Sequence, residues 1–246
     1  MMAQTGYVNV AVANIYRDPT FHCEVDTQAF IRTEDNYTGW ANKHQVIETG
    51  MRPQADWVLL TEPYLYFYEK PDVRSKKVRD GLAGISCPVI SGTGHWRETL
   101  MPDGAKAWFE EKHIGTYRSL NRHELVAYAY SFMGISYTWG GKTPFGFDCS
   151  GFIQFVYKMF GRNIRRDAQM QYEDSKHVSN YPHDGNPGDL MFFSENQKKI
   201  THVGFCIEPG KLLHCRGMVK LNSLMKNNPI FDKDLLDCFA EIRTFF

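Results

Sequence analysis

The stretch Gly140-Gly141-Lys142-Thr143-Pro144-Phe145-Gly146-Phe147-Asp148-Cys149-Ser150-Gly151-Phe152 decides the fold of the second half of this 246-residue chain. A loop broken by glycines and a proline delivers one cysteine to the start of a segment, 152–160, whose apolar residues recur at helical spacing. Gly161 stands where a helix would end. The sequence therefore predicts a helix that begins at Cys149. At a helix start, the dipole and the unpaired backbone N–H groups favour thiolate over thiol.

The residues around Cys149 carry a resemblance to a known family. Asp148-Cys149-Ser150-Gly151-Phe152, preceded by Tyr137-Thr138-Trp139-Gly140-Gly141, closely resembles the nucleophile motif of the NlpC/P60 family of cell-wall cysteine peptidases. The resemblance covers residues 120–217, and a looser one covers the region before it. A buried structural cysteine is the alternative. A histidine pair further along the chain makes that alternative the weaker one, because a catalytic cysteine needs a distant histidine partner.

The whole-chain composition argues against several classes of protein. The chain has 28 basic and 28 acidic residues and no net charge, which argues against a nucleic-acid or anionic-membrane partner. Its six cysteines show no C-x-x-C spacing, which argues against a disulfide framework and fits a reducing compartment. The first residues do not read as a signal peptide, so we expect a cytoplasmic protein. An exported form with a removed signal stays open.

The first half of the chain is rich in short β-prone runs separated by Pro, Gly, Asp and Asn, a pattern typical of small barrels or sandwiches. A weak internal repeat begins at Asn14–Pro19 and again at Tyr66–Pro71. The two units resemble bacterial SH3-type (SH3b) domains, which commonly precede NlpC/P60 domains. One irregular β domain is the alternative.

We therefore expect a multidomain protein with two small all-β SH3-like barrels and a catalytic domain. The expected boundaries are residues 1–52 for the first SH3b-like domain, 53–116 for the second and 117–246 for the NlpC/P60 domain. The family resemblance implies an α+β papain-like fold for the third, with the cysteine helix packed on an antiparallel sheet.

A predicted hairpin after residue 200 carries two histidines. In the family, a strand beginning His-Val-Gly supplies the general base, and a polar residue on the next strand orients it. His202 and His214 occupy these positions here. The turn offers a check that does not depend on the family. A two-residue Pro209-Gly210 loop would place the histidines on opposite faces of the hairpin.

A three-residue loop with Gly210 in the left-handed conformation instead pairs Ile207 with Lys211 and places Gly204 opposite His214. The histidines then share a face as diagonal neighbours. We predict that register.

Cysteine proteolysis needs a thiolate, a histidine to hold and return the proton, and a third group that orients the imidazole. Cys149 would be the nucleophile, His202 the base and then acid, and His214 the orienting residue. The Cys149 backbone N–H and the Tyr137 hydroxyl are the candidate oxyanion donors. A packed strand tyrosine is an equally good interpretation of Tyr137.

No cofactor or metal is expected. Cys206 and Cys215 flank the histidines in sequence, but the chosen register points Cys215 away from them, and the spacing fits no compact zinc site.

Within the family, the chain resembles the γ-D-glutamyl-L-diamino acid endopeptidases, which cut murein peptides that have a free N-terminal L-Ala. This resemblance implies an ammonium subsite, with Asp148 as partner, Ser150 beside it and Tyr37 of the first SH3b unit narrowing the pocket. Asp167 also matches a family position, but Ala168 stands where many relatives have Ser. A helix N-cap is the structural interpretation of Asp148, and both roles can hold together.

The predicted function is hydrolysis of the γ-D-glutamyl-diamino acid bond of murein peptides during cell-wall recycling or turnover. Two other classes stay open: a cell-wall-binding protein, and another amide hydrolase or acyltransferase on the same fold. The sequence does not distinguish meso-diaminopimelate from L-Lys as the preferred diamino acid, nor does it set the oligomeric state.

Overall fold

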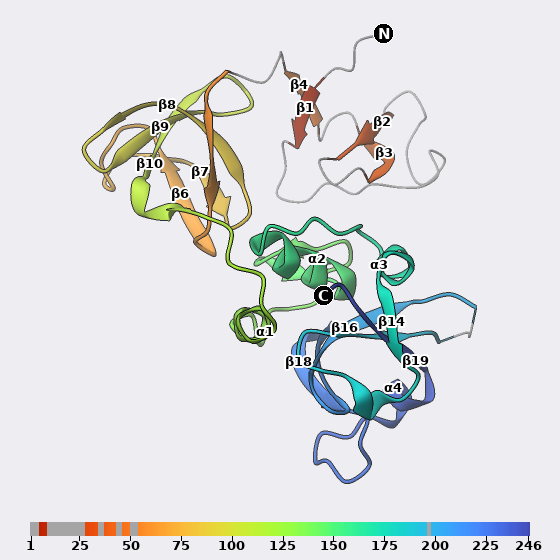
Figure 1. Ribbon diagram of the computed structural model, residues 1–246. Helices are drawn as coiled ribbons and strands as arrows, with labels where there is room; N and C mark the ends of the chain where they lie inside the picture. Colours follow the sequence, from red (N-terminus) through yellow and green to blue (C-terminus); the bar gives the residue numbers. More distant parts are fainter. Residues whose placement is uncertain (1–4, 9–27, 34–36, 43–45, 50–53, 196–197) are drawn as a thin grey trace. The chain divides into compact units, whose positions relative to one another are not determined.

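The computed structural model describes residues 5–8, 28–33, 37–42, 46–49, 54–195 and 198–246 (Figure 1). The chain divides into two compact units, Met1–Thr116 and Tyr117–Phe246. Within the described residues, no helix has the length and apolar character needed to cross a bilayer.

Two short antiparallel ladders lie in the first part of the first unit. One joins β1 (Thr5–Val8) to β4 (Val46–Thr49), and the other joins β2 (Gln28–Arg32) to β3 (Thr38–Asn42). Much of the expected first SH3b-like barrel, 1–52, lies outside the described residues.

The second part of the first unit is one antiparallel sheet in the order β11-β5-β8-β9-β10-β6-β7. Leu65 and Phe67 of β6 point into its apolar core with Phe109, while the tyrosines that alternate with them lie on the other face. The strands are β5 (Asp56–Leu60), β6 (Tyr64–Tyr68), β7 (Lys77–Leu82), β8 (Ser86–Thr93), β9 (Trp96–Leu100), β10 (Lys106–Glu110) and β11 (Ile114–Gly115).

The second unit begins with α1 (Arg122–Tyr130), whose start and stop follow from local chemistry. Asn121 caps the helix, because its side-chain oxygen accepts a hydrogen bond from the Glu124 N–H at 2.9 Å. Leu125 and Ala129 are buried, and the following turn ends at Gly134 in the left-handed region (φ 84°). Short-range contacts of Asn121 and the turn at Gly134 therefore set the two ends of α1.

The cysteine helix is α2 (Cys149–Met159), which follows the short strands β12 (Lys142–Thr143) and β13 (Gly146–Phe147). Asp148 is its N-cap and accepts from the Gly151 N–H at 2.7 Å. Nearly every residue of α2 is buried, and Gly161 follows it with φ 71°. The predicted helix at Cys149 is confirmed.

A six-stranded antiparallel sheet supports α2, in the order β14-β19-β15-β16-β17-β18. The last strand of the chain, β19, lies between β14 and β15 (Figure 1). The strands are β14 (Lys176–Ser179), β15 (Leu190–Phe193), β16 (His202–Glu208), β17 (Lys211–Arg216), β18 (Met218–Ser223) and β19 (Phe239–Thr244). In sequence, α3 (Ala168–Asp174) precedes β14, and α4 (Lys233–Asp237) lies between β18 and β19.

The two faces of this sheet pack against different elements. Phe205 contacts Phe152 of α2, with ring centroids 5.8 Å apart, and the Cys215 thiol donates to the Phe147 carbonyl at 3.2 Å. On the opposite face, Cys206 and Leu212 belong to an apolar cluster with Leu235 of α4. By strand alternation, His202 and His214 lie on the face of Cys206 and Leu212.

The β16–β17 hairpin confirms the predicted pairing of Gly204 with His214, but by a different turn. Glu208, not Ile207, pairs with Lys211, so the loop has two residues, and the predicted three-residue loop is wrong. Ile207 is instead a bulge. The extra residue shifts the side-chain alternation by one and returns both histidines to one face. Gly210 has φ 70°, as expected for the left-handed position.

Candidate active site

The Cys149 thiol lies against the start of β16. Its Sγ atom is 4.0 Å from the backbone carbonyl oxygen of Thr201. The backbone N–H groups of Ser150 and Val203 donate to the sulfur. The sulfur therefore contacts the main chain on both sides of His202.

Burial controls the acidity of this thiol. It raises the pKa of Cys149 to about 11, and the nearby Asp148 carboxylate adds to the rise. The N–H groups of Ser150 and Val203 lower the pKa, but by less. The expectation that the helix start favours thiolate is therefore outweighed by desolvation. At neutral pH the thiol keeps its proton until a base accepts it.

Three polar side chains form a hydrogen-bonded row across adjacent strands, which we call the polar row: His202 of β16, His214 of β17 and Asn222 of β18. The His202 Nε2 atom lies 2.7 Å from Nδ1 of His214, and the two rings are nearly perpendicular (80°). The His214 Nε2 atom lies 2.9 Å from Oδ1 of Asn222. The sequence predicted the two histidines but not Asn222, whose place depends on the pairing of β17 with β18.

Both histidines of the polar row are held neutral. Burial, followed by the positive charges of its surroundings, puts the pKa of His202 well below its usual value. Burial lowers the pKa of His214 to about 4, against the opposing effect of the Asn222 hydrogen bond. Lys220 and Arg216 lower both pKa values. At neutral pH the imidazole of His202 is therefore free to accept a proton.

Asp148 is held by a buried arginine as well as by the helix it caps. Its Oδ1 and Oδ2 atoms accept hydrogen bonds from the Arg166 guanidinium at 3.0 and 2.5 Å, and Oδ2 also accepts from the Gly140 N–H at 3.1 Å. Arg166 donates a further bond to the Ser150 hydroxyl at 3.0 Å. The expected cap is confirmed, and the charge of Asp148 is balanced within the protein. No sequence signal distinguished Arg166 from the exposed Arg165 beside it.

Two other predicted site residues lie in the second unit. The Tyr137 N–H donates to the Gly217 carbonyl at 2.9 Å, and burial raises the pKa of its hydroxyl to about 12, with the charges of Cys149 and Asp148 acting in the same direction. Asp167 is the half-buried N-cap residue of α3, and its charge contributes to the raised pKa of Arg166.

Tyr37, the remaining predicted site residue, belongs to the first unit. There its backbone carbonyl accepts from the Thr33 N–H at 2.8 Å.

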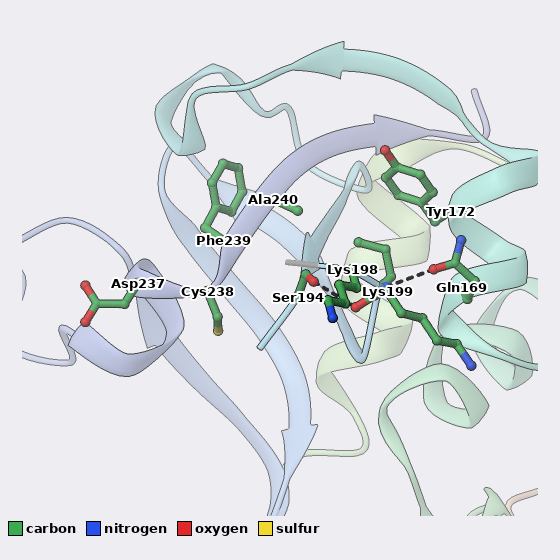
Figure 2. A pocket seen from close by; sticks show the side chains of 10 residues that line it. Gln169, Tyr172, Ser194, Lys198, Lys199, Asp237, Cys238, Phe239 and Ala240 are labelled. Carbon is green, nitrogen blue, oxygen red and sulfur yellow. Dashed lines mark hydrogen bonds between the residues drawn. The ribbon is translucent and has the colours of Figure 1, made fainter. Parts of the chain in front are cut away.

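A pocket of about 380 Å³ lies beside the segment that leads into β16 (Figure 2). Gln169 and Tyr172 of α3 form one side, and Phe239 of β19 lies on another. The Gln169 Oε1 atom accepts from the Ile200 N–H at 2.8 Å, which ties α3 to the residue before Thr201. The pocket therefore shares a wall with the segment that contacts the Cys149 sulfur.

A model of the NlpC/P60 family matches residues 134–238, a span that contains Cys149 and the whole polar row. The second unit therefore resembles an NlpC/P60 domain. NlpC/P60 is a family of cysteine peptidases, which agrees with the enzyme class expected from the sequence. The α+β papain-like domain with an antiparallel sheet is confirmed as well.

Relatives of this protein include two enzymes named γ-D-glutamyl-L-lysine dipeptidyl-peptidase. The Bacillus cereus relative is 31% identical over 199 residues, which cover 74% of this chain and 57% of the relative. The Bacillus subtilis relative is 27% identical over 224 residues, which cover 88% of this chain and 74% of the relative. The chain thus matches little more than half of the Bacillus cereus enzyme.

A solved structure extends the likeness in fold. The crystal structure of an NlpC/P60 family protein from Bacillus cereus superposes with a TM-score of 0.71, and the match covers 95% of this chain and 79% of that one. The two sequences are 24% identical, so this likeness bears on the fold.

Proposed function

We propose that this protein is a cysteine endopeptidase that hydrolyses the γ-D-glutamyl-diamino acid bond of murein peptides with a free N-terminal L-Ala. The observation that carries the proposal is the Cys149 thiol at the start of α2, in contact with the main chain around His202, whose ring is hydrogen-bonded to His214. The names of the two Bacillus relatives support the choice of bond.

The proposed reaction begins when His202 takes the proton of the Cys149 thiol. The sulfur attacks the γ-carbonyl carbon of D-Glu, and the oxyanion that forms accepts hydrogen bonds from the Cys149 N–H and the Tyr137 hydroxyl. The C–N bond then breaks as His202 gives its proton to the amine of the leaving diamino acid. Water, deprotonated by His202, hydrolyses the thioester and restores the thiol, while His214 holds the His202 ring.

Charge supports a subsite for the ammonium of L-Ala. Asp148 and Asp167 carry two negative charges, and Arg166 carries one positive charge between them. A second carboxylate near the Asp148–Arg166 pair strengthens the attraction for a cation. We assign the ammonium to Asp148 and Asp167 together and a hydrogen bond to the Ser150 hydroxyl.

The proposal also covers the domains of the first unit and the cellular role of the enzyme. We propose that residues 1–52 and 53–116 are SH3b-like domains. The seven-stranded antiparallel sheet formed by residues 56–115 supports this assignment for the second of them. We also propose a cytoplasmic role in recycling free wall peptides, since a requirement for a free L-Ala excludes peptides still attached to glycan.

Mass spectrometry of L-Ala-γ-D-Glu-meso-diaminopimelate and its L-Lys analogue, each beside an N-acetylated copy, tests the function. We expect cleavage of the free peptides alone, lost in Cys149→Ala and kept in Cys206→Ala, which removes a buried cysteine from the apolar cluster. Equal cleavage of the acetylated copies would contradict the ammonium subsite. No cleavage, with Cys149 still alkylated by iodoacetamide, would favour another amide hydrolase or acyltransferase.

A further inference from the structure

We propose that Asn222 is a positioning residue that sets the tautomers of both histidines, so that His202 keeps an unprotonated Nδ1 as the base. This inference rests on the proposed function, because it assigns a role in the same proton transfer. It concerns a residue outside the predicted Cys149, His202 and His214 set.

The polar row follows from the registers of three adjacent antiparallel strands. Gly204 is opposite His214 in the β16–β17 ladder, so His202 is the diagonal neighbour of His214. Lys220 is opposite His214 in the β17–β18 ladder, so Asn222 is the diagonal neighbour on the other side. Side chains on diagonal positions of one sheet face lie within reach of each other. The separations of 2.7 Å between His202 and His214 and 2.9 Å between His214 and Asn222 are hydrogen-bond distances.

The carbonyl oxygen of the Asn222 amide determines which nitrogen donates in each hydrogen bond of the polar row. An amide oxygen only accepts hydrogen bonds, so the Nε2 atom of His214 must be the N–H donor at 2.9 Å. A neutral imidazole has one N–H, so Nδ1 of His214 carries a lone pair. That lone pair accepts from Nε2–H of His202 at 2.7 Å. The remaining nitrogen of His202, Nδ1, is then the one that can take a proton.

The opposite amide orientation would reverse every bond. With the amide nitrogen toward His214, Nε2 of His214 would accept, and its Nδ1–H would donate to His202. His202 would then carry its proton on Nδ1 and could not act as a base through that nitrogen. The amide orientation of one residue on β18 thus decides whether the base on β16 is in its working tautomer.

The surroundings keep the row in the neutral state that this argument requires. His214 is fully buried, and the cations Lys220 and Arg216 disfavour its protonation, whereas Asp232 favours it. Once His202 takes the thiol proton, both of its nitrogens carry hydrogen, and Nε2–H still donates to His214. No bond in the row has to reverse during catalysis, which limits the reorganisation that the proton transfer requires.

Kinetics of two Asn222 variants separate positioning from packing. Asn222→Leu removes the acceptor and leaves the buried Nε2–H donor of His214 without a partner. We therefore expect kcat to fall about tenfold or more at every pH, with KM changed less than about twofold. Asn222→Asp keeps an acceptor of the same shape and adds charge. It should retain most of kcat at pH 8 and lose activity on the acid side at a higher pH than the wild type, because a carboxylate favours protonated His214.

Asn163→Leu is the matched control, since it makes the same change at an exposed asparagine beyond the end of α2. It should leave kcat and its pH profile unchanged. An Asn222→Leu enzyme with kcat within twofold of the wild type would overturn the proposal. An equal loss in Asn222→Leu and Asn222→Asp at every pH would overturn it too, because it would show that only packing matters.

Imidazole ¹⁵N NMR of the Cys149→Ala protein reads the tautomers directly and needs neither substrate nor a folded Asn222 variant. We expect Nε2 of both histidines to be protonated and Nδ1 of both to be unprotonated at pH 7. A proton on Nδ1 of His214 would overturn the proposal. Failure of the proposed function would instead show as intact peptides with the wild-type enzyme, so the two failures are distinguishable.

Discussion

Gly204 lies directly across from His214, and a Cβ atom at position 204 would meet the Cβ of His214 at 2.8 Å. The same atom would lie 3.1 Å from Cδ1 of Leu212. The His214 side chain therefore uses space that any other residue at 204 would fill. This close approach of two strands allows the His214 ring to reach His202.

Gly204→Ala should reduce kcat by about a hundredfold, because the new methyl group displaces His214 by a few tenths of an ångström or more, and small misplacements of catalytic groups are costly. Peptide cleavage and thermal unfolding would be measured together. Gly185→Ala is the control, since its Cβ would meet the Cys206 sulfur at 2.7 Å and Ile242 at 3.0 Å rather than His214. Equal losses of activity in the two variants would contradict the explanation.

Alkylation of Cys149 by iodoacetamide should speed up about tenfold for each unit of pH between 6 and 9. Burial raises the pKa of this thiol to about 11, so the reactive thiolate is a small fraction that grows with pH across this range. The measurement is the rate of Cys149 labelling by peptide mass spectrometry. A rate that levels off near pH 7 would show a preformed thiolate–imidazolium pair and contradict the prediction.

Stability should fall as the pH drops from 6.5 toward 4, because His214 binds a proton more readily when unfolded. Its pKa is about 4 in the folded protein, below the usual 6.5, so the unfolded state gains protons across this window. The contribution of this one group is up to about 1.4 kcal/mol for each pH unit. Urea unfolding at pH 7 and pH 5 would measure it.

His214→Gln should show a smaller loss of stability between these two pH values than the wild type. His202, whose pKa is also lowered, contributes in the same direction and stays in both proteins. The same loss in both proteins would contradict the assignment to His214.

Arg166→Met should destabilise the second unit by about 3–5 kcal/mol, because it leaves the buried Asp148 carboxylate without its partner. The double variant Asp148→Asn/Arg166→Met should be less destabilised than the sum of the single variants. Arg165→Met is the control: it breaks exposed ion pairs with Glu173 and Asp174 and should cost about 1 kcal/mol or less. Additive single effects in urea unfolding would rule out a coupled pair.

Local signals in the sequence were enough to predict the start of α2 and the histidine face of the hairpin. The glycine-broken loop, the N-cap at Asp148 and the left-handed Gly210 are each properties of a few neighbouring residues, and all are confirmed. The bulge at Ile207 was not predictable from the turn sequence. A two-residue loop with a bulge and a three-residue loop differ little in energy, and contacts across the whole sheet select between them.

The residues that the sequence did not reveal depend on contacts far along the chain. Arg166 lies 18 positions from Asp148, and the preceding Arg165 has the same side chain but lies at the surface. Asn222 gains its partner only through the β17–β18 register. The acidity of Cys149 was misjudged for a related reason, since the helix start is a local feature and burial is not.

The bulge at Ile207 also fixes a parity for the β16–β17 hairpin. Side chains alternate between the two faces of a strand, so the number of residues between His202 and His214 decides whether they share a face. They share one now because the bulge adds one unpaired residue to the hairpin. Insertions or deletions of two residues around Pro209 preserve this parity, whereas a change of one residue preserves it only if the bulge disappears or a second one forms. The length of this hairpin can therefore vary only in steps of two residues, although Glu208 and Pro209 are exposed to solvent.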